Sequence, residues 1–182
     1  SLLIDVGWDH TSVSMLLGAR VLYERVLHEA SLSSLYRSAT TRCGLDTHAI
    51  DTLVLAQFSG EEAQVQASLA APVRGLLSAL YDTLSAEVAR SLAYAAHRYV
   101  TIPVSSISVC GDGGALPGLV DRMKTADCPA RVIVPGELIE LGEGASRWAA
   151  CSSLTAAIGL AMPASIIAAV LEQNSKPVVG QA

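Results

Sequence analysis

The chain has 182 residues, of which 51% are hydrophobic and 4% aromatic, and its formal net charge is −5. This length suits one compact domain, with or without a small subdomain. The acidic balance argues against nucleic acid as a partner, because phosphate binding normally needs a clustered basic surface. The cysteines lie far apart in the chain, which favours buried free thiols over disulfides or a zinc site. They are Cys43, Cys110, Cys128 and Cys151.

The first thirty residues have the patterns of β-strands. An apolar run from Leu2 to Val6 ends at a glycine and is typical of a buried strand. Extended patterns follow from Thr11 to Leu17 and, after a turn, from Val21 to Leu27. We therefore predict a meander of three strands.

The following seventy residues change to helical character. Ser31 can cap a helix that stops near Gly44, and Asp46 can cap a second helix. A long helical tract then extends from Glu61 to Val100. We expect this tract to break at Pro72, because proline lacks the backbone donor that a helix interior requires.

The last third of the chain alternates between strands and helices. We predict a strand at Ile107 to Cys110, a helix from about Pro117 to Ala126 and a strand at Arg131 to Val134. Residues 137–144 resemble a loop, residues 147–171 are mainly helical, and the tail 174–182 is predicted to be disordered. The uncharged stretch 154–171 favours a buried helix interrupted by Pro163 over a membrane span. Together these elements predict an α/β fold with a mixed sheet.

The turn after the first strand contains an aspartate, a glycine and a threonine, at Asp5, Gly7 and Thr11. Such a turn can expose backbone N–H groups that cradle a phosphate. The carboxylate of Asp5 can position a metal-bound water, because a hard cation prefers oxygen ligands. The alternative interpretation is an ordinary hairpin with polar turn residues.

A second turn, between the predicted strand at Ile107 and the following helix, is rich in glycine. Gly111, Gly113 and Gly114 would let the backbone pass close to a flat ligand, since no Cβ atom obstructs it. Pro117 suits a first helical turn. The alternative is a strand-to-helix connection that needs positive φ angles.

The two turns, in this order and separated by a helical insertion, resemble the second domain of the actin-like ATPase superfamily. The tract 87–94, the glycine-rich turn and the stretch 156–161 are similar to the PilM family of type IV pilus assembly proteins within that superfamily. The positions that match the phosphate turn are Asp5, Gly7 and Thr11, and those that match the adenosine turn are Gly111, Gly113, Gly114 and Pro117.

The resemblance implies the C-terminal half of an actin-like ATPase (ribonuclease H-like) fold, with a mixed sheet and a helical inserted subdomain. Residues 1–30 and 101–173 would form the core of domain II, and residues 31–100 the inserted subdomain with a connecting helix. It places ATP against both turns and a Mg²⁺ ion at Asp5. The implied nucleotide-binding residues are Asp5, Gly7, Trp8, Asp9, His10, Thr11, Gly111, Asp112, Gly113, Gly114 and Pro117.

This sequence departs from the family pattern at four positions, with Trp8, Asp9 and His10 in place of small residues and Asp112 in place of a glycine. Bulk and negative charge both oppose phosphate binding, so we expect ATP and Mg²⁺ binding to be weak or lost. Trp8 could instead plug the pocket, meet a partner or pack at the tip of the loop.

The function that the resemblance implies is a cytoplasmic scaffold of a type IV pilus or related secretion system, without catalysis of its own. Its partners would be the tail of a PilN-like inner-membrane protein, other pilus components and further copies of itself, and it would reach the membrane only through them. The alternatives are an ATP-dependent kinase or ATPase of the same superfamily and a cell-division protein resembling FtsA.

Overall fold

The structure is a computed structural model of the whole chain, and it describes residues 1–18, 20–59, 67–140, 151–155 and 157–158. Five strands form one mixed sheet with the order β3-β2-β1-β4-β5. The strands β1 to β3 are antiparallel neighbours, whereas β4 and β5 lie parallel to β1. The predicted α/β class and mixed sheet are confirmed. The strands are β1 Leu2–Val6, β2 Thr11–Leu17, β3 Arg20–Leu27, β4 Ile107–Cys110 and β5 Ala130–Val132.

The central strand β1 carries the core of the sheet. Its side chains Leu2, Ile4 and Val6 are at most 1% exposed and alternate with half-buried residues, as one well-covered face of a strand requires. Because β4 is parallel to β1, the chain must cross over between them, and the helices that lie between Leu32 and Arg98 make that crossover.

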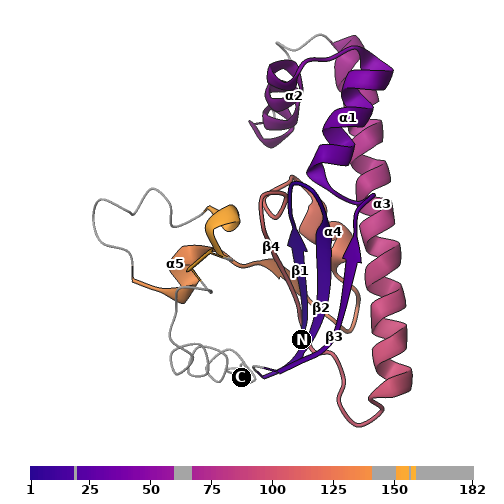
Figure 1. Cartoon of the computed structure of the whole chain (residues 1–182), viewed down its shortest axis with the longest axis vertical. Coiled ribbons are helices and arrows are strands. Elements are labelled where there is room, and N and C mark those ends of the chain that lie inside the picture. The colour runs from indigo at the N-terminus through magenta and orange to yellow at the C-terminus, as the bar shows by residue number, and fades with distance from the viewer. Residues whose placement is uncertain (19, 60–66, 141–150, 156, 159–182) are drawn as a thin grey trace.

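Three helices make up the crossover: α1 Leu32–Cys43, α2 Thr47–Ser59 and α3 Ala67–Arg98. The predicted caps are confirmed, since Ser34 N–H donates to Ser31 Oγ at 3.3 Å and Ala49 N–H donates to Asp46 Oδ1 at 2.8 Å. Gly44 ends α1 in the left-handed conformation, with φ of 67°. Figure 1 shows α1 and α2 beside one end of α3, beyond the end of the sheet, while the rest of α3 extends along the sheet.

The predicted break at Pro72 is wrong, because α3 continues through this residue. Pro72 lies near the N-terminal end of α3, where the missing donor costs a single hydrogen bond. Val73, the next residue, is fully buried and anchors that end of the helix in the core. Tertiary packing therefore keeps this part of the chain helical.

The connection after β4 also differs from the prediction. The helix α4 is only Leu119–Met123, so Pro117 stands before it rather than in its first turn. Two features account for the late start: Gly118 has a φ of 75°, and the Tyr81 hydroxyl on α3 donates to Pro117 O at 2.8 Å. The first residues of the predicted loop 137–144 lie in the short helix α5 Pro135–Leu138, whereas residues 141–144 lie outside the described residues. A 3₁₀ turn is present at Ser152–Leu154.

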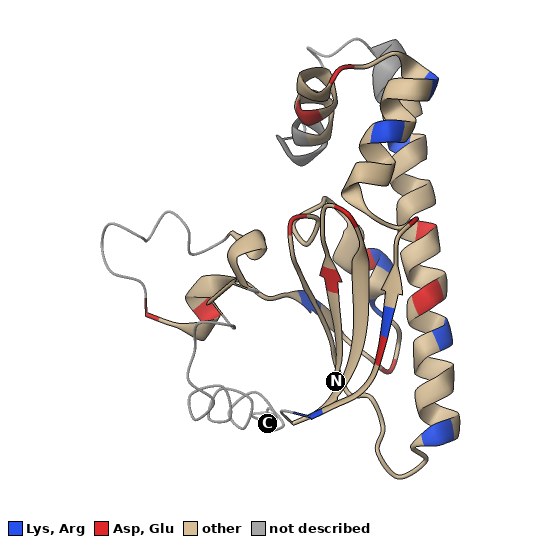
Figure 2. Cartoon of the chain, viewed as in Figure 1, with Lys and Arg blue, Asp and Glu red and all other residues tan. Residues whose placement is uncertain are grey.

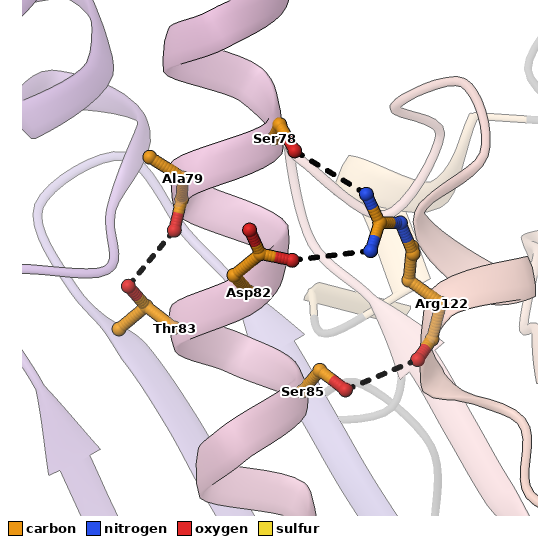
Figure 3. A network of polar contacts seen from close by, with 6 residues as sticks. All are labelled: Ser78, Ala79, Asp82, Thr83, Ser85 and Arg122. Atoms are coloured by element: carbon orange, nitrogen blue, oxygen red, sulfur yellow. Dashed lines mark hydrogen bonds and ion pairs between the residues drawn. The ribbon is translucent and has the colours of Figure 1, made fainter.

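Arg122 fastens α4 to α3. Its guanidinium donates to Asp82 Oδ1 at 3.1 Å and to Ser78 Oγ at 3.2 Å, and the Ser85 hydroxyl donates to Arg122 O at 3.3 Å (Figure 3). Because α4 follows the glycine-rich turn directly, this network holds the turn in place against α3.

All four cysteines are free thiols, as predicted, but the expectation that all are buried is wrong. Cys110 and Cys128 are buried, whereas Cys43 and Cys151 are partly exposed.

Within the described part of the chain, no helix has the length and apolar character needed to cross a bilayer. Most of the predicted helix 147–171 and the whole tail 174–182 lie outside the described residues.

Candidate functional site

The two predicted turns meet at one end of the sheet. The strands β1 and β4 are parallel neighbours, so their carboxyl ends lie at the same edge, with Asp5 opposite Cys110. The turn that follows β4 bonds to the last residue of β1, since Gly113 N–H donates to Val6 O at 2.8 Å. The resemblance places one nucleotide against both turns, which requires the turns to lie close together, and the structure brings them to the same sheet edge.

The glycine-rich turn packs directly on the end of β1. A Cβ atom on Gly111, whose φ is 84°, would lie 2.2 Å from Asp5 Oδ1 and 2.7 Å from Val6 O. A Cβ atom on Gly113 would lie 2.4 Å from Val6 Cγ1. Real Cβ atoms do not approach other atoms this closely, so contact with β1 alone accounts for both glycines.

The remaining predicted residues of the glycine-rich turn are Asp112, Gly114 and Pro117. Gly114 N–H donates to Gly111 O at 3.0 Å, which closes the turn. Gly114 is buried, whereas Asp112 is exposed and Pro117 is half-buried. Of these residues, Asp112 presents a charged group at the surface.

The turn between β1 and β2 is also closed by its own hydrogen bonds. Gly7 N–H donates to His10 O at 3.0 Å, so this amide is already paired. The carbonyl groups of the β1–β2 turn accept hydrogen bonds from the start of α1, with Ser33 N–H donating to Trp8 O at 2.8 Å. The fully buried Thr11 donates its hydroxyl to Ala30 O, which points this group into the protein.

Trp8, Asp9 and His10 project from the tip of this turn and are exposed. The indole of Trp8 is 46% exposed and packs on the ring of Tyr36 in α1, with the centroids 5.0 Å apart. Of the three interpretations of Trp8, the structure shows a loop tip packed on one side and open on the other. His10 lies 6.1 Å from His28, ring to ring.

Negative charge gathers where the turns meet. Burial raises the pKa of the Asp5 carboxyl above its usual range, while nearby His10 lowers it and the Asp112 carboxylate raises it. Burial, with the charge of Asp5, also raises the pKa of Cys110 to about 12, so this thiol stays protonated. Figure 2 shows acidic residues on the loops at this end of the sheet, and basic residues on the helices and on the strands β3 and β5.

The polar groups of the first turn are engaged within the protein, and carboxylates lie near both turns. The Gly7 amide and the Thr11 hydroxyl are used internally, and the carboxylates of Asp5 and Asp112 would repel phosphates. Among the residues that the structure describes, no group of three or more acidic, cysteine or histidine side chains is arranged to hold a metal ion.

A cavity of about 380 Å³ opens beside the glycine-rich turn, between it and the helices α1 and α2. Its walls are mostly apolar, and the Tyr36 hydroxyl donates to Asp51 Oδ1 within it. The lining residues are Leu32, Leu35, Tyr36, Asp51, Val54, Asp112, Ala115 and Leu116.

The sequence patterns did not predict this cavity. The apolar spacing of Leu32, Leu35 and Tyr36 indicates only that one face of α1 is covered, not that part of it borders a cavity. The meeting of Tyr36 with Asp51 depends on how α1 and α2 pack together, and no local pattern encodes that contact.

No protein-family model matches the sequence, and no curated protein matches it. Among solved structures, the chain is similar to one titled "PilM-PilN type IV pilus biogenesis complex", with a TM-score of 0.58 and 18% identity. That match covers 97% of this chain and 46% of the other. A second similarity, to the ethanolamine utilization protein EutJ from Carboxydothermus hydrogenoformans, has a TM-score of 0.45 and 9% identity over 71% of this chain and 44% of that one, and is too weak to support an argument.

The first match establishes the fold. The match extends over 97% of this chain, so the predicted PilM-like fold is confirmed at the level of architecture. The chain spans less than half the length of the protein it matches.

Proposed function

We propose that this chain is part of a scaffold protein of a type IV pilus or a related secretion system, acting on the cytoplasmic side of the inner membrane. The single observation that carries the proposal is the architectural match to a PilM-PilN structure over 97% of the chain. By this proposal the protein binds a PilN-like tail and reaches the membrane only through its partners. Other pilus components and further copies of itself complete the set of partners.

The proposal divides the chain into a domain II core of residues 1–30 and 101–173 and an inserted helical part of residues 31–100. The sheet and the crossover helices α1 to α3 support this division. The peptide groove for a PilN-like tail belongs, on this proposal, mainly to the part of the protein outside this chain.

In this scaffold the nucleotide half-site is degenerate, and ATP and Mg²⁺ bind weakly or not at all. Closed turns, a buried Thr11 hydroxyl and facing carboxylates at Asp5 and Asp112 support this part of the proposal. A kinase or ATPase of the same fold would instead need phosphate-binding donors at the turns, and Gly7 and Thr11 use theirs internally.

The test uses the full-length protein and the cytoplasmic tail peptide of a PilN-like inner-membrane protein from the same organism. Fluorescence anisotropy should show saturable binding of the labelled peptide, and a scrambled peptide of the same composition should not bind. Absence of binding by a folded full-length protein would contradict the scaffold proposal. ATP hydrolysis that depends on Asp5, abolished by Asp5→Asn, would favour the enzyme alternative.

A further inference from the structure

The cavity beside the glycine-rich turn combines an apolar interior with negative charge at its rim. Leu32, Leu35 and Val54 supply apolar wall, while Asp51 and Asp112 supply carboxylates from two separate elements. Among the described residues that line the cavity, none is a lysine or arginine. Such a lining suits a ligand with an apolar stem and a positively charged end.

Aromatic side chains add to the preference for a cation. The Tyr36 ring lines the cavity, and the partly exposed indole of Trp8 packs on it at 5.0 Å. Burial, and then the hydrogen bond to Asp51, raise the pKa of the Tyr36 hydroxyl, so it remains a donor and fixes the orientation of Asp51. Aromatic rings attract cations through their faces, and the effect grows as the site is desolvated.

We propose that this cavity is a docking pocket for an arginine side chain of a partner protein, whose guanidinium pairs with Asp51 and Asp112. The methylene stem of the arginine would lie against the leucines of α1 and against Leu116. The exposed face of Trp8 would form the adjoining contact, because tryptophan, tyrosine and arginine dominate the energetic centres of protein interfaces.

The occupant follows from charge complementarity. Asp51 can accept further hydrogen bonds beyond the one from Tyr36, and Asp112 lies exposed at the mouth of the cavity. A planar guanidinium has five donors and can serve two carboxylates at once. A triphosphate would bring negative charge to the same rim. This inference does not depend on the pilus function, since it uses only the cavity and its charges.

The test titrates full-length protein with butylguanidinium, followed by two-dimensional amide NMR. The matched neutral probe is butylurea, which has nearly the same shape without the charge. We expect butylguanidinium to shift the resonances of Val54, Ala115 and Leu116 in a saturable way, and butylurea to bind about tenfold more weakly or worse. Equal affinities for the two probes would overturn the proposal.

The double variant Asp51→Asn, Asp112→Asn should lower the affinity for butylguanidinium by at least about tenfold. The single variant Asp112→Asn, in an exposed turn, should weaken it in the same direction. Asp127→Asn removes an equal charge from another exposed turn and should leave the affinity unchanged. Thermal melting checks that each variant folds, and Asp112→Asn keeps the test decisive if the double variant does not.

A third probe, adenosine, distinguishes a basic side chain from a nucleoside. Adenosine that saturates the same resonances more tightly than butylguanidinium would overturn the proposal, even if the pilus scaffold function holds. Failure of the tail peptide to bind, with butylguanidinium binding intact, would instead overturn only the proposed function.

Discussion

The two turns at the end of the sheet differ in what their glycines and polar groups do. In the glycine-rich turn, Gly111 and Gly113 have no room for a side chain, because the backbone and side chains of β1 occupy that space. In the β1–β2 turn the backbone is closed on itself, but Trp8, Asp9 and His10 project to the surface. Glycines at a turn that resembles a nucleotide-binding turn can therefore reflect internal packing alone, while the exposed chemistry lies on other residues, here Trp8, Asp9, His10 and Asp112.

The largest effect should come from filling the space at Gly111. Gly111→Ala places a methyl group against Asp5 Oδ1 and Val6 O at a residue with φ of 84°, so we expect a loss of about 3 kcal/mol or more in the free energy of unfolding. The matched control is Gly44→Ala, at φ of 67° with nothing within 4 Å, which should cost about 1–2 kcal/mol. Urea unfolding measures both, and equal costs would contradict the tight packing of the turn.

A smaller effect is expected at Thr11, whose hydroxyl serves the fold in the other turn. Thr11→Val keeps the shape but leaves Ala30 O without its buried donor, which should cost about 1–3 kcal/mol. Thr83→Val removes a similar hydroxyl bond, to Ala79 O at 2.9 Å, on an exposed face of α3 and should change stability by less than about 0.5 kcal/mol (Figure 3). Similar losses in the free energy of unfolding for the two variants, measured in urea, would contradict the larger contribution predicted for the buried Thr11 hydrogen bond.

A glycine far from the turns should behave in the opposite way. Gly75 lies within α3, and a Cβ atom added to it would meet nothing within 4 Å, so Gly75→Ala should stabilise the protein by about 0.5–1 kcal/mol. Differential scanning calorimetry should show a higher melting temperature. A lower one would mean that the added methyl group disturbs a neighbour of α3, against the open space at this position.

The smallest effect concerns pH. The raised pKa of Asp5 means that the folded state binds its proton more readily than the unfolded state, so the ionised carboxylate lowers stability above that pKa. Asp5→Asn should therefore raise stability slightly near pH 7, and this gain should shrink as the pH falls through the raised pKa of Asp5 towards the ordinary aspartate range. Urea unfolding between pH 4 and 8 measures the gain, with Asp127→Asn as the control. A gain that grows on acidification would contradict the desolvation of Asp5.

The sequence predicted the strands and the helix caps at Ser31, Gly44 and Asp46, because strand alternation and capping chemistry are local signals. The meeting of the two turns was implied by the family resemblance alone. It did not predict that α3 continues through Pro72 or that α4 begins after Gly118. Those outcomes depend on tertiary contacts, such as the burial of Val73 and the bond from Tyr81 to Pro117. The cavity was missed for the same reason, since Tyr36 and Asp51 come together only when α1 packs against α2.

Calorimetric titration of Mg-ATP into the full-length protein, beside a Trp8→Ala, Asp112→Gly variant, tests the degenerate nucleotide site most directly. We predict no binding at micromolar strength by the wild-type protein, because the amide and hydroxyl of the first turn are occupied and the facing carboxylates repel phosphates. Micromolar binding by the wild type would contradict the degenerate site and would restore both turns as a working nucleotide cradle.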